Sequence, residues 1–218
     1  MENRGEGPMR KFLRLGVVAV VMLSIAACGG DGHGRTVFVA QIVSDQQTDG
    51  DIAFNGTNFT ITRGPDTLFF GIDDNDPNFP EYRAFLDFPL DGSTGQDVVP
   101  ANAAIVSATL KVFLDEVSFA TVVPTLIDLV PYPVSGLRPQ DFNSPPLVFR
   151  RLDFFRSDQG NFVAIDVTPL MQEAQRLGLS DFQVRFLLDF SVSDIGFVGI
   201  EDLPQVTITA PLLTVEYE

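Results

Sequence analysis

A run of oxygen-bearing side chains at residues 73–78 is the first stretch of this sequence whose residue types could do chemistry. Carboxylate and amide oxygens are the ligands that Ca²⁺ prefers. The run supplies four such groups: Asp73, Asp74, Asp76 and Asn78. Phe79 stands where an EF-hand loop needs glycine and Phe85 where it needs a bidentate glutamate, which excludes an EF-hand. The run predicts either a simple structural Ca²⁺ site or a solvated acidic turn.

Arginines cluster once after the N-terminal region, at Arg150, Arg151 and Arg156. Paired guanidinium N–H donors could hold a uronic acid or a sulfate group. Asp153 and Asp158 lie beside them in the sequence, and the arginines could equally neutralise these acids. Both interpretations stay open at this point.

Tyr82 and Tyr132 are the aromatic side chains that we expect to be exposed and able to stack against a sugar ring. The sequence has no tryptophan, and most of its 20 phenylalanines fall on alternating positions that face a core. Surface sugar binding is therefore an open hypothesis.

Groups for catalysis are scarce. A Ser-His-Asp or Cys-His arrangement would have to use His33, the single histidine, which lies in a glycine-rich stretch. A carboxylate pair for glycoside cleavage stays an alternative, but no local pattern selects two of the acidic residues. We expect no enzyme activity and no cofactor other than structural Ca²⁺.

Cys28, the only cysteine, follows a basic stretch and an apolar run at residues 15–25. The run is too short to span a membrane comfortably and has the length of a signal peptide. Its end, Ala26-Ala27-Cys28-Gly29, resembles a bacterial lipoprotein signal. The resemblance implies cleavage before Cys28 and lipid attachment to it, which would give a stable membrane anchor. The alternative is an ordinary secretory signal that contains a cysteine.

The sequence thus predicts three parts: a lipoprotein signal peptide at 1–27, a lipidated cysteine with a flexible tether at 28–35, and one β-sandwich domain at 36–218. The predicted location is the bacterial cell envelope, and the outer membrane if the host is Gram-negative. Removal of residues 1–27 leaves 10 basic and 27 acidic residues, a net charge of −17. Such a surface repels phosphate groups, which excludes nucleic acid as a partner.

The elements that must position these groups are strands. Residues 82–90 and 106–114 alternate with a period of two around a Gly/Ser/Thr/Asp turn region, so each predicts a strand with one core face and one wetter face. Phe85 and Phe113 interrupt the pattern on the wetter side. Further strands are predicted at 36–43, 59–62, 67–71, 120–130, 147–155, 162–168, 182–190, 197–201 and 212–217.

Three other segments complete the expected domain. Residues 44–51 read as a polar loop, and residues 131–146, with five prolines, read as a long irregular excursion that either is functional or covers a sheet edge. Residues 168–178 predict one short helix, with Thr168 as its N-cap and Gly178 at its end.

The order of these pieces resembles the DNRLRE-type domain, a jelly-roll β-sandwich related to disaggregatase repeats and certain carbohydrate-binding modules. The matching motifs are Arg83-x-x-Leu86-x-Phe88, Pro100-x-x-Ala103-x-Ile105, Ser107-Ala108-x-Leu110, Asp166-Val167-Thr168 and Pro211-x-Leu213-x-Val215-x-Tyr217. The family's late Ser-Arg-Glu piece appears only as Gly199-Ile200-Glu201, and its tryptophans are absent. The resemblance implies an all-β, jelly-roll-like antiparallel sandwich whose ligand is a polysaccharide.

Three functions follow from these observations. The first is a lipid-anchored envelope protein with a non-catalytic, carbohydrate-binding module. The second is a structural envelope component that docks on another protein through a sheet face or the proline-rich segment. The third is a divergent polysaccharide-degrading enzyme. The observation that separates them is whether a sheet face carries exposed aromatic and polar side chains or is covered.

Overall fold

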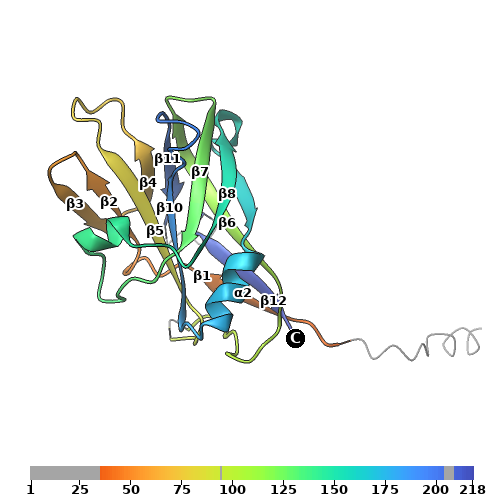
Figure 1. The fold of residues 1–218 in the computed structure, drawn as a ribbon. Coiled ribbons are helices and arrows are strands. Elements are labelled where there is room, and N and C mark those ends of the chain that lie inside the picture. Colours follow the sequence, from red (N-terminus) through yellow and green to blue (C-terminus); the bar gives the residue numbers. More distant parts are fainter. Residues whose placement is uncertain (1–34, 94, 204–208) are drawn as a thin grey trace, which may run out of the picture. The chain divides into compact units, whose positions relative to one another are not determined.

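The computed structural model describes residues 35–93, 95–203 and 209–218 (Figure 1). Within them, residues 37–218 form a compact unit in which 12 strands build one curled, mostly antiparallel sheet. The described part has a single α-helix. These features confirm the predicted jelly-roll-like antiparallel β-sandwich with one short helix. Cys28 and the predicted signal peptide lie outside the described residues, and no helix among the described residues is long and apolar enough to cross a membrane.

The first layer of the sandwich has four antiparallel strands, paired in the order β1, β12, β6, β9. Their bounds are β1 Phe38–Val43, β12 Leu212–Tyr217, β6 Ile105–Ser118 and β9 Phe162–Asp166. β6 extends four residues beyond its predicted end, and this extension pairs with β11 of the second layer. β6 therefore joins the two layers.

The second layer runs in the order β8, β7, β10, β5, β4, β11. Their bounds are β8 Val148–Phe155, β7 Val122–Leu129, β10 Asp181–Leu188, β5 Glu81–Pro89, β4 Thr67–Ile72 and β11 Phe197–Glu201. A hairpin of β2 (Gly50–Phe54) and β3 (Phe59–Arg63) attaches to β5 through β2. β2 was not expected. Its first two residues lie in the predicted polar loop at 44–51, and no strand was predicted for the other three.

The core lies between the layers and is formed by the strand faces that the period-two alternation of apolar residues predicted. From β5 it receives Ala84, Leu86 and Phe88, and from β6 it receives Leu110 and Val112, all with no exposed surface. The two strands that frame the turn region therefore lie in different layers and contribute to the same core, rather than pairing with each other.

The predicted wetter face of β5 is wrong, because Phe85 and Asp87 are also completely buried. Phe85 belongs to a second apolar cluster outside the sheet, with Ile52 of β2 and with Leu137 and Phe142 of the proline-rich segment. This segment contains the short helix η1 (Pro139–Asn143), which packs beside the β2–β3 hairpin (Figure 1). It covers a sheet face, not a sheet edge.

The helix α2 spans Thr168–Arg176, close to its predicted bounds. Its N-cap is Val167, not Thr168, and no side chain caps it. The Thr168 hydroxyl instead accepts a hydrogen bond from the backbone N–H of Ala108 (2.9 Å). This contact ties the start of the helix to β6, while Leu170 and Met171 enter the core. A second short 3-10 helix, η2 (Arg156–Asp158), follows β8.

Candidate functional site

The outer face of the first layer is open. Alternate residues of its four strands point away from the core, and none of them is buried. We call this surface the open face; it comprises Val39, Gln41 and Val43 of β1, Leu212, Thr214 and Glu216 of β12, Ser107, Thr109, Lys111 and Phe113 of β6, and Phe162, Ala164 and Asp166 of β9. One sheet surface thus carries two phenylalanines at one end and hydroxyl, amide and charged groups along its strands.

The two aromatic rings of the open face form a pair. Phe113 and Phe162 are opposite each other in the β6–β9 ladder, with ring centroids 5.2 Å apart and an interplanar angle of 74°. The Lys111 Nζ atom lies 4.0 Å from the centroid of the Phe162 ring. Phe162 is 38% exposed, so part of its ring is accessible from solvent. The pair offers an aromatic surface with a cation beside it.

Polar contacts fix several other side chains of the open face, further along the strands from this pair. The Ser107 hydroxyl donates to Glu216 Oε2 (3.0 Å) across the β6–β12 ladder. Asp166 accepts hydrogen bonds from the Thr168 hydroxyl (2.6 Å) and from Arg150. These bonds, that from Thr168 first, lower the pKa of Asp166 to about 2, so its carboxylate is charged at neutral pH. Hydrogen-bond donors and acceptors of the open face are therefore held in place by their neighbours.

The proline-rich segment covers the outer face of the second layer over β2, β5 and β10, and three arginines hold this cover, while the outward residues of β8 stay exposed. Arg83 and Arg185 donate to the Phe142 carbonyl, and Arg63 donates to the Leu137 carbonyl. The Arg83 guanidinium also lies 3.9 Å from the centroid of the Phe142 ring. The proline-rich segment is thus bound to the sheet by guanidinium groups, and its buried residues are not available to a partner.

The predicted sugar-stacking tyrosines do not form a platform. Tyr132 is only 6% exposed and packs edge-on against Phe85 (5.5 Å), so the expectation that it is exposed was wrong. Tyr82 is half-buried and meets Phe69 and Phe197 edge-on, at 6.3 and 5.5 Å. Its ring therefore belongs to a local aromatic cluster rather than to a flat exposed surface.

The predicted arginine cluster is divided between two directions. Arg150 and Arg151 are consecutive in β8, so their side chains leave the strand on opposite sides. Arg150 pairs with Asp166 (2.6 Å) and Arg151 with Asp189 (2.9 Å). The neutralising acids are these two, not the neighbouring Asp153 and Asp158. The two guanidinium groups do not form a joint anion site.

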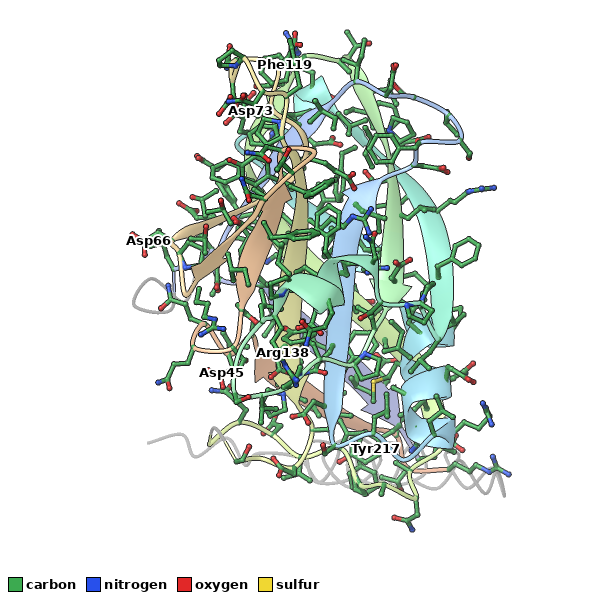
Figure 2. The ribbon with its side chains drawn as sticks, turned by 60° about the vertical axis from the view of Figure 1, so that its left-hand side comes forward. Asp45, Asp66, Asp73, Phe119, Arg138 and Tyr217 are labelled. Atoms are coloured by element: carbon green, nitrogen blue, oxygen red, sulfur yellow. The ribbon has the colours of Figure 1, made fainter. Side chains whose placement is uncertain are left out.

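The acidic loop at 73–78 joins β4 to β5, at the end of the sandwich opposite to Tyr217 (Figure 2). Its side chains serve its own turn: Asp73 Oδ1 accepts from the Asn75 N–H (2.9 Å), and Asp76 Oδ1 from the Asn78 N–H (2.8 Å). Across the described ranges, no group of three or more His, Cys, Asp or Glu side chains is arranged to hold a metal ion. The calcium site stays a prediction.

Four buried aspartates lie near the β1–β2 turn: Asp49, Asp51, Asp87 and Asp202. Asp49 Oδ1 accepts the Asp87 N–H (2.6 Å), and Asp202 Oδ1 accepts from the Ser44 hydroxyl (3.1 Å). Each of the four keeps one oxygen without a hydrogen-bond partner. Burial raises the pKa of Asp51, Asp87 and Asp202 to about 6 and that of Asp49 well above its usual value. Sequence reasoning missed this cluster.

The open-face aromatic pair was also missed, although one sequence feature pointed to it. Phe113 interrupts the polar side of an alternating strand, where solvent contact disfavours a large apolar residue. Its partner Phe162 comes from a strand 49 positions later, and the ladder that joins them is visible only in the fold.

Fold and surface together define a class: an antiparallel β-sandwich with one sheet face partly covered by the proline-rich segment and one open face that carries an aromatic pair and polar side chains. Comparison with known proteins assigns nothing narrower, because no protein-family model matches the chain and no curated protein matches it.

Proposed function

We propose that this protein is a lipid-anchored component of the bacterial cell envelope whose jelly-roll-like domain binds polysaccharide on the open face without cleaving it. The observation that carries the proposal is the Phe113–Phe162 pair, whose Phe162 ring is 38% exposed, on a sheet face that also carries hydroxyl, amide and carboxylate groups further along its strands. A pyranose ring has an apolar C–H face that packs on an aromatic ring, and its hydroxyls exchange hydrogen bonds with polar side chains. The resemblance to DNRLRE-type domains supports the same ligand class.

The negative charge of the domain limits the class of polysaccharide that it can bind. With a net charge of −17 after residue 27, the domain repels polyanions such as uronic acid polymers. Lys111 is the only lysine of the open face, and it is already engaged with the Phe162 ring. A neutral polysaccharide is therefore the ligand that this surface suits best.

Replacing Phe162 with Ala tests the glycan proposal. We expect the Phe162→Ala variant to bind a neutral polysaccharide about tenfold more weakly, because ~1.4 kcal/mol of stacking is lost. Affinity electrophoresis of a soluble form starting at Arg35, in gels containing one polysaccharide each, measures this effect. Phe149→Ala is the matched control, since Phe149 is an exposed phenylalanine (53%) on β8, away from the open face.

Three outcomes would contradict the proposal. Retention of no polysaccharide in a broad panel, with or without Ca²⁺, would favour the structural envelope component, for which crosslinking in native membranes should then recover a protein partner. Release of reducing sugar from any polysaccharide in the panel would favour the degrading enzyme. An equal loss of retention for Phe162→Ala and Phe149→Ala would remove the open face as the binding surface.

The anchor has its own test. Cys28→Ser removes the sulfur that would carry lipid, so we expect the variant to leave the membrane fraction and appear in the soluble envelope fraction. Immunoblotting of fractionated cells measures the shift, and Ser24→Ala, within the same segment, serves as the control. Wild-type protein that already fractionates as soluble would contradict lipid anchoring.

A further inference from the structure

The strand β8 lies at an edge of the second layer, because it pairs only with β7 among the described residues. Figure 1 shows it beside β7, on the side of that strand away from β10 and β5. It is eight residues long, and its exposed residues occupy alternate positions. The backbone N–H and C=O groups on the free side of such a strand can pair with another strand. β8 is therefore a candidate interaction surface.

The backbone groups of the exposed residues face the free side of β8. Directly after β8, the Arg156 N–H donates to the Thr121 carbonyl (3.0 Å), which continues the β7–β8 register. The direction of backbone hydrogen bonds alternates along a strand, so the even-numbered residues of β8 bond to β7. The odd-numbered residues, 149 to 155, direct their N–H and C=O groups away from β7. Among the described residues, only the Phe155 N–H has a partner on that side, Asp158 Oδ2 (2.8 Å).

The outward side chains of β8 follow one another in the order Phe149, Arg151, Asp153 and Phe155. The two phenylalanines are 53% and 46% exposed. Asp153 lies opposite Pro124 of β7, and its carboxylate has no hydrogen bond or ion pair with any described residue. The Arg151 side chain is 64% exposed although it pairs with Asp189, and a guanidinium has further N–H donors to share. An exposed base and an unpaired acid thus lie between two aromatic rings.

We propose that two copies of this protein associate through β8, with the two strands antiparallel across a two-fold axis at Leu152. In this register, Arg151 of each copy lies opposite Asp153 of the other, and Phe149 lies opposite Phe155. Residues directly opposite each other in an antiparallel pair point to the same face, with Cβ atoms about 4.5–5.5 Å apart, so opposite charges and aromatic rings meet. The residues that pair are also those whose backbone groups face the free side. Backbone and side chains therefore select the same partner, a second copy of this chain.

Other pairings lose this complementarity. The two neighbouring symmetric registers place Arg151 opposite Arg151 or Asp153 opposite Asp153, and like charges directly opposite are destabilising. A shift by one residue would place outward side chains opposite inward ones, and backbone groups that face the partner opposite groups that face β7. An unrelated strand would leave both charges without partners, which is how charges on an edge strand prevent non-specific pairing. The charge order of β8 thus favours its own copy.

Reversal of one charge tests this dimer. The full chain, purified in detergent, should be a dimer, and Arg151→Asp should raise its dissociation constant about tenfold or more, because acids then lie opposite acids. Asp153→Arg should have the same effect, because bases then lie opposite bases. Sedimentation equilibrium in density-matched detergent, over a series of protein concentrations, measures the constant. Arg176→Asp is the matched control, since the Arg176 side chain is 66% exposed, also pairs with an acid and lies on α2.

A mixture of the two single variants gives the sharpest result. One variant has two acids on β8 and the other has two bases, so each alone should be mostly monomeric and the mixture should form a heterodimer as tight as the wild-type dimer. A variant that merely unfolds would not be rescued in this way. A wild type that is monomeric at every concentration would overturn the proposal. So would a dimer that neither single variant weakens, or a mixture that stays monomeric. This inference is independent of the proposed glycan binding, because β8 belongs to the other layer.

Discussion

Replacing Arg185 with Met is expected to lower the free energy of unfolding by about 3–5 kcal/mol, a large part of the total for a domain of this size. Arg185 and Asp128 form an ion pair at 2.5 Å, and both side chains are 3% exposed. Burial already raises the pKa of Asp128 despite this partner. Without Arg185, the Asp128 carboxylate would stay buried with no counter-charge, and the carbonyls of Asp141 and Phe142 would lose a donor.

Urea unfolding followed by circular dichroism measures this loss. Arg176→Met is the matched control, because the Arg176–Glu173 pair is an exposed helix pair and its removal should barely move the midpoint. The double variant Arg185→Met with Asp128→Leu should recover part of the stability, since it removes the uncompensated charge. An Arg185→Met variant as stable as the wild type would show that Arg185 does not hold the proline-rich segment on the sheet.

The second large effect is a fall in stability as the pH rises from about 4 through about 6. The pKa values of Asp51, Asp87 and Asp202 are raised to about 6 in the folded protein by burial. A raised carboxyl pKa means that the folded state binds protons more tightly than the unfolded chain does. The stability that this tighter proton binding contributes is therefore fully present below the pKa of the unfolded chain and is lost as the pH rises through the pKa of the folded protein. Each carboxyl group taken alone would change the free energy of unfolding by on the order of 3 kcal/mol over this pH range. Because the groups interact, their combined effect is smaller than the sum of the single effects.

Asp49→Asn tests the origin of this dependence. The asparagine keeps the Oδ1 acceptor for the Asp87 N–H and removes a carboxyl group whose own pKa is raised well above its usual value by burial and by the charge of Asp202. We expect the variant to be more stable than the wild type at pH 8 and its stability profile between pH 4 and 7 to be flatter. Asp115→Asn, an exposed charge-matched change, should follow the wild-type profile. A wild-type profile that is flat over this window would contradict the raised pKa values.

The local elements were largely predictable. The bounds of β11 and β12 match the predicted ones, and in β12 a period-two pattern of Leu213, Val215 and Tyr217 indicated the strand. The opposite directions of Arg150 and Arg151 also followed from the predicted strand at 147–155, since consecutive residues of a strand face opposite sides. A joint anion site from these two residues was therefore inconsistent with the strand prediction itself.

Other features depended on contacts between distant segments. Residues 44–51 are polar, which favours a loop, yet Asp49, Gly50 and Asp51 are buried because β2 pairs with β5 and the aspartates accept hydrogen bonds from β5 and β4. Tyr132 follows a strand and reads as a surface aromatic, but the proline-rich segment folds back and buries it. No local pattern carries this information.

The sequence by itself determined which residues of β5, β6, β9, β10 and β12 face the core between the layers, because strand geometry sends alternate side chains to opposite sides and apolar residues occupy one of them. It did not determine which outer face is open. Phe85 and Phe113 interrupt the polar sides of their strands in the same way, yet Phe85 is completely buried and Phe113 contributes to the open face. Only the tertiary structure decided between them, since guanidinium groups from three strands hold residues 131–146 over one layer and leave the other uncovered.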